Sequence, residues 1–176
     1  MAGIDDHVLE LSGPGIELRT ATAGDGDLIR RIVAMAAHWR THDVPHELAT
    51  EVDKYHQNWG RTGDVGVVAF RGIEFAGGAY ARQFDADDGA YGYIANDIPE
   101  LTIGVEVEYR RRGIGVLCLA ALKAKVLEDG GRGISLSVEP DNNARLLYAQ
   151  MGFGLVEDRG QDLLMLWQPK KSSAKS

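Results

Sequence analysis

The segment from Arg110 to Val116 has the residue types and the spacing of an anion-binding site. It reads Arg-Arg-Arg-Gly-Ile-Gly-Val, and it lies between an alternating apolar run and a long helical pattern. Glycine allows a ligand to approach the backbone closely, and the first amides of a helix have no acceptor within the helix. Because the helix dipole and three arginines add positive charge, this segment predicts a site for a phosphate or a diphosphate.

A purely structural role and two nucleotide-binding motifs are the alternatives for this segment. A capped helix start with solvated arginines stays open, since short glycine motifs are common. A nucleotide P-loop is excluded because it requires a Gly-Lys-Ser/Thr ending. A dinucleotide-binding fingerprint is excluded too, because it needs a third small residue where Leu117 and Cys118 stand.

Two further residue groups could carry chemistry but do not favour it. His38, His42 and His46 are spaced four apart, as metal ligands on one helix would be, but Pro45 interrupts that helix. We therefore expect no metal site. Cys118 lies on the apolar face of a predicted helix, where a buried, inert thiol is expected rather than an acyl carrier.

The secondary structure that must position these residues follows from hydrophobic periodicity. Strands are predicted where apolar residues alternate, and helices where they recur every three to four residues. A helix is predicted to begin at Thr22 or Asp25 and to end near Trp39. The other predicted elements are strands at Ile16–Arg19, Val65–Phe70, Glu74–Phe84, Glu100–Val107, Ile134–Val138, around Phe153 and at Leu163–Trp167, and helices at Glu47–Gln57, Ile114 to Gly130, and Asn142–Met151.

The order of these elements predicts a mixed sheet. The two strands that flank residues 71–73 form an antiparallel hairpin. The strand, helix and strand between residues 101 and 138 require a right-handed crossover, which pairs the two strands in parallel. The fold class is therefore predicted to be α+β.

Composition sets the limits on size, location and partners. The chain has 176 residues, enough for one domain, which we expect at residues 16–168 after a loose segment 1–15 and before a flexible tail 169–176. A net charge of −7 argues against nucleic acid, and the longest apolar runs are too short to cross a membrane. A single cysteine fits a reducing cytoplasm.

Two linked motifs resemble the GNAT superfamily of acetyl-CoA-dependent N-acetyltransferases. The first is Arg110-x-x-Gly113-x-Gly115 after a strand, and the second is the stretch from Val138 to Phe153, which reads Val-Glu-Pro-Asp-Asn-Asn-Ala-Arg-Leu-Leu-Tyr-Ala-Gln-Met-Gly-Phe. The resemblance is strong over residues 99–158 and extends in element order from residue 16. It implies a GNAT-like splayed sheet, mostly antiparallel and flanked by about four α-helices, with acetyl-CoA in the gap between two strands.

The resemblance also implies which residues hold acetyl-CoA. Asn142 corresponds to the family asparagine that helps to place the pantetheine arm. Backbone groups near Ile103, Val105 and Val107 are expected to pair with the pantetheine. The diphosphate is expected at the segment formed by Arg110, Arg111, Arg112, Gly113, Ile114, Gly115 and Val116.

Amine acetylation needs a base or a water chain, because an alkylammonium with a pKa of about 10.4 has no free electron pair. Glu100 resembles the strand glutamate that serves as base in part of the family, with a solvated strand-end charge as the alternative. Glu106, on the same strand face, is the second choice, with an ordinary surface residue as its alternative. Tyr148 resembles the tyrosine near the thioester sulfur, where it can donate a proton or only a hydrogen bond; its alternative is a buried anchor of the short helix.

The expected reaction is transfer of an acetyl group to a primary amine by direct attack on the thioester. The acceptor is an amine-bearing small molecule or a peptide, with neither nucleic acid nor membrane as partner, and a homodimer stays open. An acyl-CoA-binding regulatory module without turnover is the alternative. By resemblance, Trp39, His42 and Trp59 are candidates for contact with the acceptor, and packing beneath the cleft is the alternative role for them.

Overall fold

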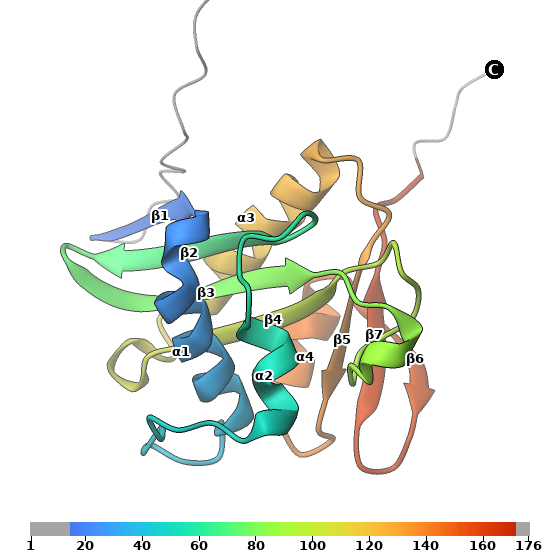
Figure 1. The fold of residues 1–176 in the computed structure, drawn as a ribbon, viewed down its shortest axis with the longest axis horizontal. Coiled ribbons are helices and arrows are strands. Elements are labelled where there is room, and N and C mark those ends of the chain that lie inside the picture. Colours follow the sequence, from blue (N-terminus) through green and yellow to red (C-terminus); the bar gives the residue numbers. More distant parts are fainter. Residues whose placement is uncertain (1–14, 172–176) are drawn as a thin grey trace, which may run out of the picture.

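The computed structural model describes residues 15–171 and consists of one seven-stranded sheet with helices on both faces (Figure 1). Residues 1–14 and 172–176, which include most of the predicted loose start and tail, lie outside the described residues. In chain order the strands and α-helices are β1 (Ile16–Thr20), α1 (Gly26–Ala37), α2 (Asp53–His56), β2 (Val65–Arg71), β3 (Glu74–Arg82), β4 (Glu100–Val105), α3 (Ile114–Glu128), β5 (Ile134–Val138), α4 (Ala144–Gln150), β6 (Gly154–Asp158) and β7 (Leu163–Trp167).

The sheet is mixed and mostly antiparallel, as predicted. Its strand order is β1-β2-β3-β4-β5-β7-β6, with β4 and β5 parallel and the other neighbouring pairs antiparallel. In Figure 1, α1 and α2 lie in front of the sheet, and α3 and α4 lie behind it. The expected α+β architecture with about four α-helices is therefore confirmed.

Each face of the sheet has its own apolar core. On one face, Ile29 and Ile32 of α1 pack with Val68 of β2. On the other, Leu122 of α3 packs in a cluster that includes Leu136 of β5. Full burial of one such side chain stabilises the fold by about 1.5–3 kcal/mol. The apolar contacts therefore keep the helices packed against both faces of the sheet.

The sheet is splayed between β4 and β5. β4 pairs with β3 along its whole length, from Glu100 to Val105. Within the described residues it pairs with β5 at a single position, Glu100 with Ser135. Beyond that position the two strands diverge, and a gap opens in the middle of the sheet.

The strand predicted at Glu100–Val107 is shorter than its sequence pattern suggested. The strand ends at Val105, and Val107 belongs to a 3₁₀ turn that extends to Tyr109, so the prediction of a strand to Val107 is wrong. The apolar alternation continues through Val107, but the last rung is made when the Glu106 amide donates to the Ala76 carbonyl at 2.9 Å.

The weak helix predicted at Glu47–Gln57 is reduced to α2 and a preceding 3₁₀ turn, Thr50–Val52. It ends because Gln57 is extended, with a ψ of 144°.

No helix within residues 15–171 is long and apolar enough to cross a membrane.

Candidate active site

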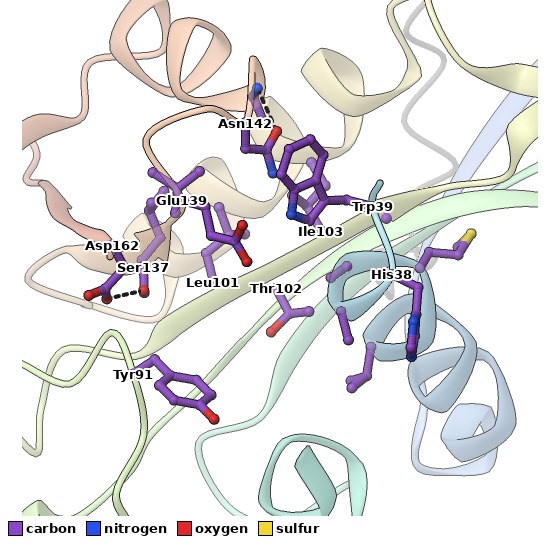
Figure 2. A pocket seen from close by; sticks show the side chains of 18 of the residues that line it. His38, Trp39, Tyr91, Leu101, Thr102, Ile103, Ser137, Glu139, Asn142 and Asp162 are labelled. Carbon is purple, nitrogen blue, oxygen red and sulfur yellow. Dashed lines mark hydrogen bonds between the residues drawn. The ribbon is translucent and has the colours of Figure 1, made fainter. Parts of the chain in front are cut away.

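A cavity of about 1210 Å³ lies where β4 and β5 separate. Its walls come from the end of α1 and the loop after it, from α2, β4 and β5, and from the starts of α3 and α4. Figure 2 shows Tyr91 on one side and Trp39 and Asn142 on the other, with Leu101, Thr102 and Ile103 along the strand between them. The predicted residues that line it are Glu100, Ile103, Val105, Arg110, Gly115, Asn142 and Tyr148.

The backbone of β4 presents hydrogen-bonding groups to this gap. The Glu106 amide points to β3, whereas the Pro99 carbonyl accepts a bond from the Ser135 amide of β5 at 3.0 Å. Because backbone groups alternate along a strand, those of Ile103 and Val105 face β5. They lie beyond the last β4–β5 rung, on the side where an extended ligand could pair with them.

The N-terminus of α3 has the features expected of an anion site. Gly113, the residue before the helix, has a φ of +79°, and no side chain caps the first amides. Arg111 has a φ of +62° and is exposed, and the Arg112 guanidinium lies 5.9 Å from the centre of the Tyr109 ring. Ile114 is buried in the core, so its backbone alone can face a ligand.

Arg110 and Asn142 each make a local hydrogen bond at the cavity. The Arg110 Nε donates to the Val105 carbonyl at 3.0 Å, which ties the loop to the end of β4. The Asn142 Oδ1 accepts the Ala144 amide at 2.9 Å at the start of α4. The side-chain nitrogen of Asn142 is left to donate elsewhere.

Glu100 is a buried acid beside the single β4–β5 rung, with 4% of its surface exposed. Its Oε1 accepts the Gly92 amide at 2.8 Å and the Tyr55 hydroxyl at 3.2 Å. Its Oε2 is buried and has no hydrogen-bond partner among residues 15–171. Burial raises the pKa of Glu100 to about 7, against the lowering effect of these two hydrogen bonds and of Arg159 and Lys54.

Gly92 allows the backbone to reach this carboxylate. A Cβ atom at position 92 would lie 2.7 Å from Oε1 of Glu100 and 2.8 Å from its Cδ. A side chain at position 92 would therefore displace the Glu100 carboxyl group from its present place beside the Gly92 amide.

Tyr148 lies in the wall of the same cavity. Its ring packs at 5.9 Å from that of Phe153, and burial raises the pKa of its hydroxyl. At neutral pH the hydroxyl is therefore protonated and can donate a hydrogen bond. This position is compatible with both predicted roles, a donor in the cavity and an anchor of α4.

The sequence profile of the acetyltransferase (GNAT) family matches residues 32–153. The chain belongs to the acetyltransferase (GNAT) family. The resemblance inferred from its two motifs is thereby confirmed. A comparison with curated proteins found no match.

Solved structures share the fold of this GNAT family member at low sequence identity. The GNAT domain of S. lividans PAT is 18% identical, covers 88% of this chain and 90% of its own, and has a TM-score of 0.65. The PaiA N-acetyltransferase from Thermoplasma acidophilum, in complex with coenzyme A, has 16% identity, coverage of 88% and 99%, and a TM-score of 0.61. YncA from Salmonella typhimurium, solved with its cofactor acetyl-CoA, has 16% identity, coverage of 92% and 98%, and a TM-score of 0.64.

Several other candidates from the sequence have structural roles in this acetyltransferase-family fold. Glu106 forms a two-point ion pair with Arg31 of α1, at 2.7 and 2.8 Å, and does not line the cavity. Trp59 donates to the Thr22 carbonyl at 2.8 Å and packs on Tyr80, also away from the cavity. Burial raises the pKa of the Cys118 thiol to about 12, as expected for an inert core cysteine.

The three spaced histidines do not come together as ligands. α1 ends at Ala37, so His38 lines the cavity while His42 and His46 are exposed in the loop. In the part of the chain that the structure describes, no group of three His, Cys, Asp or Glu side chains is arranged to hold a metal ion.

Two tyrosines that line the cavity were not predicted from the sequence. Tyr55 and Tyr91 lie next to Glu100, and their ring centroids are 6.2 Å apart in a stacked arrangement. Trp39, a predicted contact, lines the cavity too and is covered by Arg40, whose guanidinium lies 4.4 Å from its ring. The signal for Tyr55 was weak, since it lies in a segment with poor helical periodicity; a buried tyrosine hydroxyl that needs a partner was the one available clue.

Proposed function

We propose that the protein transfers an acetyl group from acetyl-CoA to a primary amine, with Glu100 as the general base. The observation that carries the proposal is the state of Glu100. It is a buried carboxyl in the cavity, with one oxygen held by two donors and the other free of any partner within residues 15–171. A base with a pKa near 7 is well suited to accept a proton at neutral pH.

The residues around the gap fit acetyl-CoA. The backbone groups of Ile103 and the Val105 amide, which face the gap, suit an extended amide-bearing arm, whereas the Val105 carbonyl already accepts the Arg110 Nε. The uncapped start of α3 behind Gly113 suits a diphosphate. At this loop Ile114 can offer only its backbone because its side chain is buried, and the exposed Arg111 and Arg112 add positive charge. Val107, in its 3₁₀ turn, is left out of this proposal.

When bound, acetyl-CoA supplies the acetyl group as a thioester. Oε2 of Glu100 takes the proton from the acceptor ammonium, directly or through water, which frees the electron pair that attacks the thioester carbonyl. The new C–N bond forms, the C–S bond breaks, and the nitrogen loses its second proton to water or to the departing thiolate, which leaves a neutral amide. The Tyr148 hydroxyl donates a hydrogen bond to the departing thiolate, which has a pKa of about 8.5 and scarcely needs a full proton.

The test is replacement of Glu100 by glutamine in a thiol-release assay with acetyl-CoA and a panel of primary amines. The panel should hold polyamines, an aminoglycoside and lysine-containing peptides. We expect Glu100→Gln to lower kcat about 100-fold or more. In the wild-type protein kcat/KM should rise with pH through about 7, because Glu100 must be ionised to act, and this limb should vanish in the variant.

Glu106→Gln is the matched control, because Glu106 lies directly after the same strand and pairs with Arg31 instead. We expect it to keep near wild-type turnover. Loss of turnover in Glu106→Gln but not in Glu100→Gln would move the base to Glu106. A regulatory module would bind acetyl-CoA but release no thiol with any amine.

A further inference from the structure

We propose that Tyr55 is a positioning residue that holds Oε1 of Glu100, so that Oε2 is the atom presented to the acceptor. This assignment rests on the proposed function, because it explains how the base of that reaction is oriented. Tyr55 and Glu100 are 45 residues apart in the chain and meet only in the folded protein.

The hydrogen bonds around the Tyr55 hydroxyl determine where its proton points. The hydroxyl oxygen accepts the Tyr91 amide at 2.8 Å. Its one proton is then directed to Oε1 of Glu100, at 3.2 Å. With the Gly92 amide, two donors hold the same carboxylate oxygen, which restricts rotation of the carboxyl group.

The Tyr55 ring is held on two sides. It meets Phe84 edge to face at a centroid distance of 5.2 Å and stacks on Tyr91 at 6.2 Å. Only 7% of Tyr55 is exposed. The hydroxyl therefore has little freedom to leave Glu100.

The short helix that carries Tyr55 is anchored from β3. α2 has four residues, too few for a stable helix by itself. The Tyr80 hydroxyl donates to the Tyr55 carbonyl at 2.7 Å, and Arg82 donates to the carbonyls of Lys54 and Gln57 at 3.0 and 2.7 Å. A buried two-point pair with Asp64, at 2.9 and 2.8 Å, fixes Arg82 in turn.

The groups that face Glu100 decide how loss of the Tyr55 hydroxyl acts on it. Burial is the main influence and raises the pKa of Glu100, while the bonds from Gly92 and Tyr55 and the charges of Arg159 and Lys54 lower it. Arg82 and Ser135 are its register neighbours on β3 and β5, and Tyr80 also interacts with its charge. Removal of the Tyr55 donor therefore makes the carboxylate harder to ionise.

The experiment is a carbon-13 NMR titration of labelled glutamate carboxyl groups in the full chain, with the Glu100 signal assigned from its loss in Glu100→Gln. In Tyr55→Phe we expect the Glu100 pKa to rise. The acid limb of kcat/KM should move to higher pH, and kcat at neutral pH should fall roughly tenfold, a smaller loss than in Glu100→Gln. The KM for acetyl-CoA should stay unchanged, because Tyr55 lies outside the β4 edge and the α3 loop.

Tyr93→Phe is the control, since the Tyr93 hydroxyl bonds Asn96 and not Glu100; it should leave the titration and kcat as in the wild type. A second variant keeps the shape of Tyr55 if phenylalanine prevents folding. Replacement of Tyr55 by 3-fluorotyrosine makes the hydroxyl a stronger donor, so the Glu100 pKa should fall.

The outcomes separate this inference from the proposed function. An unchanged Glu100 pKa in both Tyr55 variants, in a protein that releases thiol, would overturn the role of Tyr55 alone. If the Glu100 pKa changes as expected but neither the wild type nor any variant releases thiol, acetyl transfer is overturned and the Tyr55–Glu100 coupling is supported.

Discussion

Glu100 links the chemistry of the site to the stability of the chain. A buried carboxyl is easier to keep protonated, and its pKa of about 7 lies above its ordinary value of 4.5. The folded protein therefore holds this proton more tightly than the unfolded chain. The stability that Glu100 contributes is fully present below pH 4.5 and is lost as the pH rises through about 7.

This linkage predicts that Glu100→Gln becomes relatively more stable as the pH rises. One pKa unit corresponds to about 1.4 kcal/mol, so ionisation of buried Glu100 costs on the order of 3 kcal/mol at high pH. The free energy of unfolding of the variant minus that of the wild type should increase by up to this amount between pH 5 and pH 8.5. Urea titrations at both values measure it, and a difference that is constant with pH would contradict a raised pKa.

At the scale of elements, the two ends of α3 provide a matched pair of glycines. Gly113 precedes the helix with a φ of +79°, and Gly130 follows it with a φ of +77°. A Cβ atom would meet nothing within 4 Å at either position. An alanine at either site therefore costs backbone strain alone, about 1–2 kcal/mol.

We predict that Gly113→Ala weakens acetyl-CoA binding and that Gly130→Ala does not. Both variants should lose similar stability, but only the first changes the backbone where the diphosphate is proposed to bind. We expect the Kd for coenzyme A to rise about tenfold in Gly113→Ala, which equals about 1.4 kcal/mol. Isothermal titration calorimetry measures it, and equal Kd values for the two variants would place the diphosphate elsewhere.

At the scale of the whole molecule, the sheet consists of two parts that meet at one rung. β1 to β4 form one part and β5 to β7 the other, joined through the pair of Glu100 with Ser135 and covered by the helices. A ligand that pairs with the open edge of β4 bridges these parts. Its binding energy then adds to the stability of the folded chain.

Acetyl-CoA is therefore expected to raise the Tm. At a concentration 100 times its Kd the added stability is about 2.7 kcal/mol, or roughly 5–10 °C for a chain of this size. ATP and NAD should have a much smaller effect at the same concentration. A thermal shift that is as large with ATP as with acetyl-CoA would favour a nucleotide-binding protein instead.

The sequence alone determined the features that depend on local order along the chain. Alternation predicted the strand that begins at Glu100, and the structure confirms it. The spacing of Arg110, Gly113 and Gly115 predicted an anion site at the start of α3, which stays a prediction. The periodicity gave a wrong strand end at Val107, because the apolar alternation continues there after strand pairing has stopped. It also gave a wrong length for α2, because this four-residue helix depends on contacts from Tyr80 and Arg82.

Only the tertiary structure decided which of Glu100 and Glu106 keeps a carboxylate oxygen without a partner among residues 15–171. Glu106 meets Arg31, 75 residues earlier, and Glu100 meets the Tyr55 hydroxyl and the Gly92 amide in a buried place. Residues on the same face of a strand share the same local pattern, so sequence cannot tell them apart. Burial raises the pKa of Glu100, and Arg31 pairs with Glu106; both environments arise only when distant segments pack together.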